Sequence, residues 1–552
     1  MNQTLRDQVR AWIAGDPDPE DRATLASLLD DSNEDELKRR FAAPLTFGTA
    51  GLRGPVMAGP AGMNRYTVRR ATQGVIAWLN EIGVDAERGV VVGRDGRRGS
   101  EAFNSEAVHV LLGAGVKVFE MPEPLPTPLV AYCVKELGAA AGIMITASHN
   151  PPDDNGYKLY SSDGSQIIPP NDEIVERFAD AATSPVLAER PSSHHRWISP
   201  DVLTKYRDHM SRRFSVPGGT DFPIAYTPLH GVGGSTMMEL FAEAGYRNVT
   251  KVVEQFEPDG RFPTLPFPNP EESGALDLAV ATADRVGATL VIANDPDADR
   301  LGAAVKGSAG WHVLRGDEIG WLLATMLLPE MTGSNDSVAT TIVSSTMLGA
   351  MAREAGVPFN MTLTGFKWLA RAAGTGVLRF GYEEALGFAV DPLVADKDGM
   401  SAALALSLLA VQLDVKGQTL LDRLDEVESH FGVHSIYQLS LRAGGPDGLE
   451  AIRNAVTRMR ERPPSSLGGI DVSESFDLAN GYEGLGSTDG VLLRLGSSGR
   501  VVVRPSGTEP KLKAYIEITS PPSTVTSLAI QRQEAATKVS AVRVELEDLL
   551  RF

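Results

Sequence analysis

The stretch that decides the fold class is "RGVVVGRDGRRGSEAFNSEAVHVLLGAGVKVFEM", residues 88–121. A short apolar run is followed by a polar turn, by a stretch that predicts a helix, and by a second β-rich run, "VKVFEM". We expect Ser100 to be the N-cap of that helix. This alternation of strand and helix predicts a parallel sheet that is covered by helices.

The same rhythm returns twice along the chain, near "FPIAYTPLHG" and near "SVATTIVSS". From about residue 434 the runs "HSIYQLSLR" and "GVLLRLGSSGRVVVRPSG" instead indicate an antiparallel sheet with helices. We therefore predict three similar α/β domains with mixed or parallel sheets, followed by a C-terminal α+β domain. The predicted domains span residues 1–205, 206–330, 331–433 and 434–552.

Composition limits the classes of protein to which this chain can belong. Of its 552 residues, 42% are hydrophobic and 22% charged, as in ordinary globular proteins. The net charge of −19 argues against non-specific nucleic-acid binding, and a single cysteine excludes an internal disulfide. No apolar run reaches the length of a membrane span, and the polar, helical N-terminal segment is unlike a signal peptide. We expect a cytoplasmic monomer or homodimer with no nucleic-acid or membrane partner.

The stretch "MITASHNPPDDNGYK", residues 144–158, carries many reactive side chains just past a predicted strand. Ligands of parallel α/β sheets bind at that end of the strands. Pro151 and Pro152 prevent a helix, so we expect Ser148 on a loop, with neither helix nor strand in this stretch. An activated serine can carry a phosphoryl group. A Ser/Asn turn followed by an Asn-Gly turn is the alternative.

Three aspartates follow an apolar strand in "LVIANDPDADRLG", residues 290–302. Asp295, Asp297 and Asp299 are spaced by two, which puts their carboxylates on one face of an extended loop. Hard carboxylate oxygens suit Mg²⁺, whereas an EF-hand loop is excluded by Arg300 and Lys306 at its sixth and twelfth positions. A polar turn is the weaker alternative.

A phosphate cradle is predicted in "VVVRPSGTEPKLKAYIEI", residues 501–518. Arg504 offers a bidentate fork, and Gly507 exposes backbone N–H groups. Ser506, Thr508 and Lys511 add further donors. A simple hairpin turn is the alternative to this interpretation.

Weaker signals lie in several other loops. Glu383 and Glu384 of "GYEEALG" can accept sugar hydroxyls, although such a pair is usually a solvated helix start. Isolated basic or polar residues also follow predicted strands, and each by itself is typical of a capped turn: Arg53, Arg94, Arg97, His230, Lys367 and Lys397.

Taken together and in this order, "TASHNP", "DPDADR", "GYEEALG" and "RPSGTEPK" resemble the motifs of the α-D-phosphohexomutase superfamily. The resemblance covers nearly the whole chain and implies four domains around a central cleft. It implies that Ser148 is a phosphoserine carrier. It also implies that Mg²⁺ is bound by Asp295, Asp297, Asp299 and a phosphoryl oxygen on Ser148.

The resemblance also implies roles for residues in the other loops. Lys158, with Arg53, is expected to assist proton transfer, and His149 is a possible substitute. The "RPSGTEPK" loop is expected to hold the non-reacting phosphate of the substrate. The remaining candidates for substrate binding are Arg300, Gly365, Lys367, Glu383, Glu384 and Lys397.

The implied activity is reversible phosphoryl transfer between the 1- and 6-positions of a hexose phosphate. A sugar 1,6-bisphosphate is the expected intermediate and activator. Glucose phosphate is the first candidate and mannose phosphate the second. Ala385 stands where the family commonly has serine, and "YEEALG" resembles the branch that includes phosphopentomutases and bisphosphate synthases. A phosphopentomutase, a bisphosphate synthase, a sugar-phosphate phosphatase and a non-catalytic sugar-phosphate binding protein therefore remain alternatives.

Overall fold

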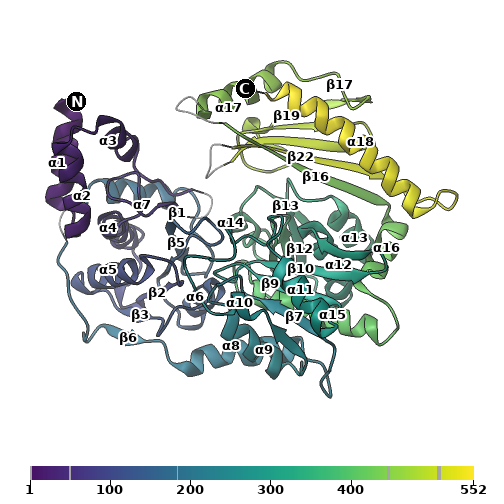
Figure 1. The fold of residues 1–552 in the computed structure, drawn as a ribbon, viewed down its shortest axis with the longest axis horizontal. Coiled ribbons are helices and arrows are strands. Elements are labelled where there is room, and N and C mark those ends of the chain that lie inside the picture. Colours follow the sequence, from purple (N-terminus) through teal and green to yellow (C-terminus); the bar gives the residue numbers. More distant parts are fainter. Residues whose placement is uncertain (1–2, 49–50, 183–184, 444–447, 507–510, 552) are drawn as a thin grey trace. The chain divides into compact units, whose positions relative to one another are not determined.

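The structure, a computed structural model, describes residues 3–48, 51–182, 185–443, 448–506 and 511–551 (Figure 1). The chain divides into two compact units. The first comprises residues 1–314 and 386–411, and the second comprises residues 315–385 and 412–552.

The first unit begins with a small helical cluster formed by α1 (Gln3–Gly15), α2 (Pro19–Asp30) and α3 (Glu34–Arg40). Its core contains Trp12 and Leu25, one from each of the first two helices. The Asp18 side chain accepts a hydrogen bond from the Glu20 N–H and so caps α2, whose first residue is proline.

A six-stranded sheet follows in the order β1-β5-β4-β2-β3-β6. The β4-β2-β3-β6 ladders are parallel, whereas β5 is antiparallel to both β1 and β4. The strands are β1 (Leu52–Pro55), β2 (Val90–Arg94), β3 (Val118–Glu120), β4 (Ala141–Ile145), β5 (Asp154–Ser161) and β6 (His195–Trp197). The helices are α4 (Arg65–Glu81), η1 (Ala86–Arg88), α5 (Ser100–Gly113), α6 (Thr127–Glu136) and α7 (Asn171–Asp180).

Alternating residues of the central strands face opposite layers of helices. Val90 and Val92 pack into one core with residues of α4 and α5. Glycines stand on the other face, where α6 approaches closely. A Cβ atom on Gly93 would lie 2.6 Å from Val130, and one on Gly142 would lie 2.5 Å from Val134. The sheet is therefore covered on both faces, as the βαβ pattern predicts.

Two local predictions for this sheet are wrong. The stretch from Asp154 to Lys158 is part of β5 and not a loop. Its pairing with β4 joins Met144 to Lys158, and this non-local ladder overrides the Asn-Gly turn signal. Ser100 is the first residue of α5 and not its N-cap, because Gly99 precedes it in a left-handed conformation and the Ser100 hydroxyl donates to Asp95.

The second sheet of the first unit has the order β11-β10-β9-β7-β8. The β8-β7-β9 ladders are parallel and the β9-β10-β11 ladders are antiparallel. Its strands are β7 (Ile224–Thr227), β8 (Val249–Lys251), β9 (Leu290–Asn294), β10 (Leu301–Gly307) and β11 (Gly310–Leu314). Helices of this part are α8 (Pro200–Arg213), α9 (Gly234–Glu243), α10 (Val253–Phe256) and α11 (Asp277–Val286). The later segment 386–411 adds β15 (Gly387–Ala389) and most of α15 (Gly399–Asp414).

The second unit opens with a parallel ladder in which β12 pairs with both β13 and β14. The strands are β12 (Asp336–Thr341), β13 (Phe359–Thr362) and β14 (Val377–Glu383). The helices are α12 (Gly316–Leu327), η2 (Leu328–Glu330), α13 (Met347–Ala355), α14 (Phe366–Leu369) and α16 (Leu420–Phe431).

An antiparallel sheet completes the second unit, in the order β16-β22-β21-β20-β19. Its long strands are covered on one face by α17 and α18, which bury residues such as Val456 and Val539 (Figure 1). The elements are β16 (Val433–Arg442), α17 (Gly448–Glu461), β17 (Ser466–Leu467), β18 (Ile470–Asp471), β19 (Glu474–Asp477), η3 (Leu478–Asn480), β20 (Val491–Arg494), β21 (Gly499–Pro505), β22 (Lys511–Ser520) and α18 (Leu528–Leu549). The prediction of three α/β sheets and a C-terminal α+β part is confirmed.

None of the helices in the described part of the chain combines the length and the apolarity that crossing a bilayer requires.

Candidate active site

Ser148 lies in a tight loop directly after β4 and is almost fully buried, with 1% of its surface exposed. Its backbone is left-handed, with φ of +52°. That conformation costs a residue other than glycine about 1–2 kcal/mol. The Ser148 N–H donates to the Thr146 hydroxyl at 2.8 Å. The Ser148 hydroxyl donates to Asp295 Oδ2 at 2.7 Å and lies 3.1 Å from His149 Nδ1.

The three predicted aspartates gather in the turn after β9. Asp295, Asp297 and Asp299 are buried, and one carboxylate oxygen of each lies within 4.8 Å of the others. The Arg300 N–H donates to Asp295 Oδ1 at 2.9 Å, which closes the turn back on its first carboxylate. The carboxylates are therefore together as predicted, but the segment is a turn and not the extended loop that was expected: the Ala298 N–H donates to the Asp295 carbonyl at 2.8 Å, and Ala298 has a φ of +55°.

Lys158 reaches this cluster from β5. Its ammonium donates to Asp297 Oδ2 and to Asp299 Oδ2, each at 2.7 Å, and the whole residue is buried. The ammonium thereby balances part of the charge of three carboxylates that lie away from water.

The carboxylate oxygens of this cluster are suitable ligands for a divalent metal ion. The second oxygens of Asp297 and Asp299, the Oδ1 atoms, are buried and accept no hydrogen bond from the described residues. Unpaired buried carboxylate oxygens are costly, and hard oxygen ligands are those that Mg²⁺ prefers. Asp295, Asp297 and Asp299 could therefore hold Mg²⁺ beside the Ser148 hydroxyl.

The carboxyl groups of the cluster have pKa values that are shifted in opposite directions. Burial, followed by the Asp297 and Asp299 charges, raises the pKa of Asp295 well above its usual value. Burial would also raise the pKa of Asp299, but the charges of Lys158 and Lys397 outweigh it and hold that pKa below its usual value. A bound cation would favour the charged form of all three carboxylates.

Removing the Lys158 ammonium should destabilise the protein in a way that Mg²⁺ partly repairs. In the presence of a chelator, Lys158→Met is expected to lower the free energy of unfolding by about 3–5 kcal/mol, because two buried carboxylates lose their counter-charge. Added Mg²⁺ should restore part of the lost free energy of unfolding, because the bound cation neutralises the carboxylates in place of the ammonium. Chemical denaturation with and without Mg²⁺ measures both effects.

The matched control is Lys306→Met. Lys306 also pairs with an aspartate, Asp284, at 2.6 Å, but both side chains are about half exposed. Such a pair contributes about 0–1 kcal/mol. A Lys158→Met protein as stable as the control, with or without Mg²⁺, would contradict this account of the cluster.

Other predicted residues of the first unit also lie at this site. Lys397 Nζ is 3.4 Å from Asp299 Oδ2. Burial lowers the pKa of the Arg53 guanidinium, and the charges of Asp297 and Asp299 oppose that shift. Burial, reinforced by the positive charges of Arg300 and Arg53, lowers the pKa of His149 well below its usual value.

Glu383 is the last residue of β14 in the second unit, and Glu384 is the first residue after it. The Gly365 N–H donates to Glu383 Oε1 at 2.7 Å, which joins two of the predicted substrate loops. The Ser344 hydroxyl donates to Glu384 Oε2 at 3.1 Å. The Lys367 ammonium lies 5.9 Å from the centre of the Trp368 ring. The Glu-Glu pair thus lies at the end of a strand and the start of a turn, and not at a helix start.

A further buried carboxyl group in this region is Asp317, at the start of α12. Its Oδ1 accepts hydrogen bonds from the Ser345 N–H at 2.7 Å and from the Tyr382 hydroxyl at 2.9 Å. Burial raises the pKa of Asp317 to about 7, with a smaller contribution in the same direction from the Glu384 charge.

Asp317→Asn should therefore change how stability depends on pH. The folded protein binds the Asp317 proton more tightly than the unfolded chain does, so stability falls as pH rises from about 4 to about 7. Asparagine keeps the Oδ1 acceptor but does not titrate. The variant should therefore lack the fall in the free energy of unfolding between about pH 4 and 7, which is on the order of 2–4 kcal/mol. Denaturant unfolding across this pH range measures the difference between the two proteins.

The control for that prediction is Asp336→Asn. The ion pair with Arg379 lowers the pKa of Asp336, so its contribution is lost only as pH falls below about 4. An Asp317→Asn protein with the wild-type slope between pH 4 and 7 would show that Asp317 does not bind the proton.

The predicted phosphate loop joins β21 to β22. Arg504 lies on β21 opposite Lys513, and the Ser506 N–H donates to the Lys511 carbonyl at 2.8 Å. Gly507 and Thr508, two of the predicted ligands, lie outside the described residues. Arg504, Ser506 and Lys511 are thus neighbours at one end of this hairpin.

Thr127 is a residue of the first-unit site that the sequence reasoning missed. Its hydroxyl donates to Asp297 Oδ2 at 2.6 Å, and its N–H donates to the Asp297 carbonyl at 2.9 Å. These bonds cross 170 residues of sequence. The only local signal is a threonine placed between two prolines at the start of α6.

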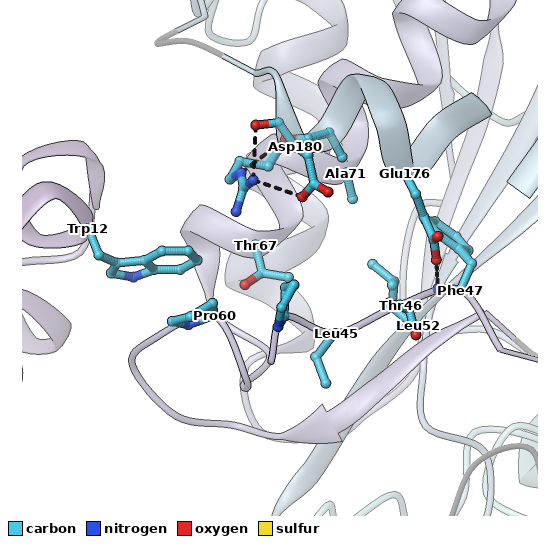
Figure 2. A pocket seen from close by; sticks show the side chains of 13 residues that line it. Trp12, Leu45, Thr46, Phe47, Leu52, Pro60, Thr67, Ala71, Glu176 and Asp180 are labelled. Carbon is cyan, nitrogen blue, oxygen red and sulfur yellow. Dashed lines mark hydrogen bonds and ion pairs between the residues drawn. The ribbon is translucent and has the colours of Figure 1, made fainter. Parts of the chain in front are cut away.

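The first unit also contains a pocket of about 60 Å³. Figure 2 shows its lining, which includes Trp12 of α1, Thr67 of α4 and the segment leading into β1. The Phe47 N–H donates to Glu176 at its wall. None of the predicted site residues lines this pocket. It is therefore separate from the cluster around Ser148.

Comparisons with known proteins agree with this fold. Residues 44–185, 204–310 and 315–430 match the models of phosphoglucomutase/phosphomannomutase α/β/α domains I, II and III, and residues 467–534 match the C-terminal domain of the same family. The chain belongs to the phosphoglucomutase/phosphomannomutase family, whose members are mutases of the α-D-phosphohexomutase superfamily.

Relatives with different named activities resemble this chain. A Haemophilus influenzae protein named as a probable phosphomannomutase is 38% identical, over 83% of this chain and 93% of its own. Mouse phosphopentomutase is 34% identical over 95% of this chain and 91% of its own. The crystal structure of a phosphoglucomutase/phosphomannomutase family protein from Burkholderia thailandensis has the same fold. Its TM-score is 0.70 at 19% identity, and the match covers 92% of this chain and 97% of that chain.

Proposed function

We propose that this protein is a phosphohexomutase that moves a phosphoryl group between the 1- and 6-positions of a hexose phosphate through phosphorylated Ser148. The observation that carries the proposal is the 2.7 Å hydrogen bond from the Ser148 hydroxyl to Asp295, inside a buried cluster of carboxylates. A serine held there can be charged with a phosphoryl group whose negative charge a cation on the same carboxylates offsets.

In the first half-reaction the bond from phosphorus to Ser148 Oγ breaks, and a bond to the free hydroxyl oxygen of the sugar phosphate forms. The sugar hydroxyl gives up its proton to a general base, Ser148 Oγ takes up a proton as its bond to phosphorus breaks, and the product is a sugar 1,6-bisphosphate. In the second half-reaction the bisphosphate, after turning over, returns its other phosphoryl group to Ser148. Mg²⁺ bound to Asp295, Asp297 and Asp299 would supply positive charge for the transferring group.

Lys158, assisted by Arg53, is the proposed acceptor of the sugar proton; it would do so as the neutral amine, because an ammonium has no lone pair to accept a proton. The support is its position on β5, where the ammonium lies 2.7 Å from two of the proposed metal ligands. The second candidate is His149, whose Nδ1 lies 3.1 Å from the Ser148 hydroxyl. A general base must lie within hydrogen-bond reach of the proton that it removes.

The substrate is proposed to be held by groups from other loops. Glu383 and Glu384 would accept sugar hydroxyls, and Gly365, Lys367, Arg300 and Lys397 would line the sugar phosphate. Arg504, Ser506 and Lys511, together with Gly507 and Thr508, would hold the phosphate that does not react. Arginine and backbone N–H groups suit that role because they recognise the phosphate and not a particular carbon atom of the sugar.

A hexose is the proposed substrate, with glucose preferred over mannose, and the likeness to a named phosphomannomutase at 38% identity supports that class. A pentose phosphate is the second candidate. It is favoured by the likeness to mouse phosphopentomutase along 95% of this chain. Ala385 also removes a hydroxyl beside the glutamates that would read the sugar.

Steady-state turnover of glucose, mannose and ribose 1-phosphates tests the choice of sugar. With Mg²⁺ and a catalytic amount of glucose 1,6-bisphosphate, we expect the highest kcat/KM for glucose 1-phosphate and activity that depends on the bisphosphate. Ribose 1-phosphate as the best substrate would replace the hexose proposal with the pentose one. Net accumulation of bisphosphate would indicate a synthase, and release of inorganic phosphate without isomerisation would indicate a phosphatase.

A further inference from the structure

Arg97 is a buried arginine that the proposed chemistry does not use. It lies in the turn between β2 and α5, and only 4% of its surface is exposed. A charged side chain is rarely this buried unless several partners satisfy its donors. From the sequence alone, Arg97 is typical of a residue in an ordinary capped turn.

The Arg97 guanidinium is directed into the loop that carries Ser148. Its Nη2 donates to the Ser148 carbonyl at 2.5 Å and to the Asn150 carbonyl at 2.6 Å. Its Nη1 donates to the Pro151 carbonyl at 2.8 Å and to the Asp154 carbonyl at 3.2 Å. One side chain thus binds four backbone oxygens along seven residues of the loop.

This loop has few backbone bonds of its own. Pro151 and Pro152 have no N–H to donate. Within the loop, the Asn150 N–H donates to Ala147 at 3.0 Å, and the Asp154 N–H donates to Pro151 at 3.1 Å. The Arg97 fork therefore supplies the donors that a helix or a sheet ladder would otherwise provide.

Arg97 is itself fixed from two sides. Asp95 Oδ2 lies 3.3 Å from its Nε, while Asp95 Oδ1 accepts the Arg97 N–H at 3.0 Å. The Phe262 ring lies 4.8 Å from the guanidinium carbon. A planar guanidinium held in this way can place four carbonyl groups, which an ammonium group with its single nitrogen cannot do.

We propose that Arg97 is a positioning residue that holds Ser148 in its left-handed conformation, so that Oγ is aimed at Asp295 and the phosphoryl group is presented for transfer. This inference rests on the proposed function of Ser148. Among the described residues, Arg97 makes no hydrogen bond or ion pair with Ser148 Oγ or with the carboxylates of the cluster. It acts through the backbone of residues 148–154.

The test is the rate of a single phosphoryl transfer. Wild type, Arg97→Ala and Arg97→Lys are each charged with glucose 1,6-bisphosphate, mixed with glucose 1-phosphate and Mg²⁺, and quenched. Both variants should transfer about 100-fold more slowly, since displacing a reacting group by about 1 Å can cost that much. The steady-state KM for glucose 1-phosphate should change little.

Chemical rescue separates positioning from a general loss of structure. Millimolar guanidinium should restore part of the transfer rate of Arg97→Ala, whereas ethylammonium at the same concentration should not. Arg98→Met is the matched control, because Arg98 is the exposed neighbour of Arg97 in the same turn. This variant should transfer the phosphoryl group at the wild-type rate. Arg97→Lys, which keeps the charge beside Asp95, covers the case in which Arg97→Ala does not fold.

Hydrogen exchange of residues 146–155 is followed in the same proteins. Faster exchange in Arg97→Lys, with slow transfer, supports the proposal. Unchanged exchange, or transfer at the wild-type rate in a folded Arg97 variant, overturns it. If the wild type carries no phosphoryl group on Ser148, the proposed function fails, and the exchange result still decides whether Arg97 holds the loop.

Discussion

Ser148→Ala should lower the rate of sugar-phosphate isomerisation by about 10³-fold or more, even with the bisphosphate and Mg²⁺ in excess. Among the described residues, Ser148 is the one whose hydroxyl donates to Asp295, at 2.7 Å, and loss of a covalent nucleophile has effects of this size or larger. A coupled assay of glucose 6-phosphate formation measures the loss. Intact-mass measurement should also show that the variant lacks the phosphoryl group that the wild type carries.

The matched control for this variant is Ser407→Ala. Ser407 is another fully buried serine, in α15, and its hydroxyl has no hydrogen-bond partner among the described residues. Its removal should leave both turnover and stability close to wild type. Isomerisation by Ser148→Ala at the wild-type rate would remove the serine from the mechanism.

Asp297→Asn should lower turnover by about 10²–10³-fold at saturating substrate, because the charge that offsets the transferring phosphoryl group is lost with the metal ion. Asp297 is the best aspartate to replace. Its Oδ1 is an unpaired oxygen available to a cation, and its Oδ2 accepts from Thr127 and Lys158. Titration of Mg²⁺ by calorimetry should show weaker binding in the variant.

Asp163→Asn is the control for the metal assignment. Asp163 lies in the turn after β5 and accepts hydrogen bonds from Ser161 and Ser165, outside the carboxylate cluster. This variant should bind Mg²⁺ and turn over as the wild type does. Mg²⁺-dependent turnover of Asp297→Asn at the wild-type rate would contradict the metal assignment.

Much of the site could be predicted from the sequence where the signal is local. Ser148 and Asp295 each come directly after an apolar strand, β4 or β9, and strand ends in α/β sheets are where polar residues gather. The spacing of the aspartates predicted that they share one face of an extended loop. The structure does bring one oxygen of each within 4.8 Å of the others, but through a turn in which Ala298 is left-handed.

What the sequence could not predict depends on contacts between distant segments. Lys158 was placed on a loop because Asn-Gly usually marks a turn, but pairing of β5 with β4 and β1 makes it part of a strand. Thr127 reaches Asp297 across 170 residues, and Arg97 reaches Ser148 across 51. No periodicity or local spacing encodes which carbonyl or carboxylate such a side chain meets.

The central claim, that Ser148 carries the transferred phosphoryl group, is tested most directly by rapid-quench mass spectrometry of the wild-type protein. Phosphorylated protein is mixed with glucose 1-phosphate and Mg²⁺, and its mass is followed within a single turnover. We predict that the protein loses one phosphoryl group from the peptide that contains Ser148, and that glucose 1,6-bisphosphate forms in equal amount. A phosphoryl group that maps to another residue, or that stays on Ser148 while substrate turns over repeatedly, would contradict the claim.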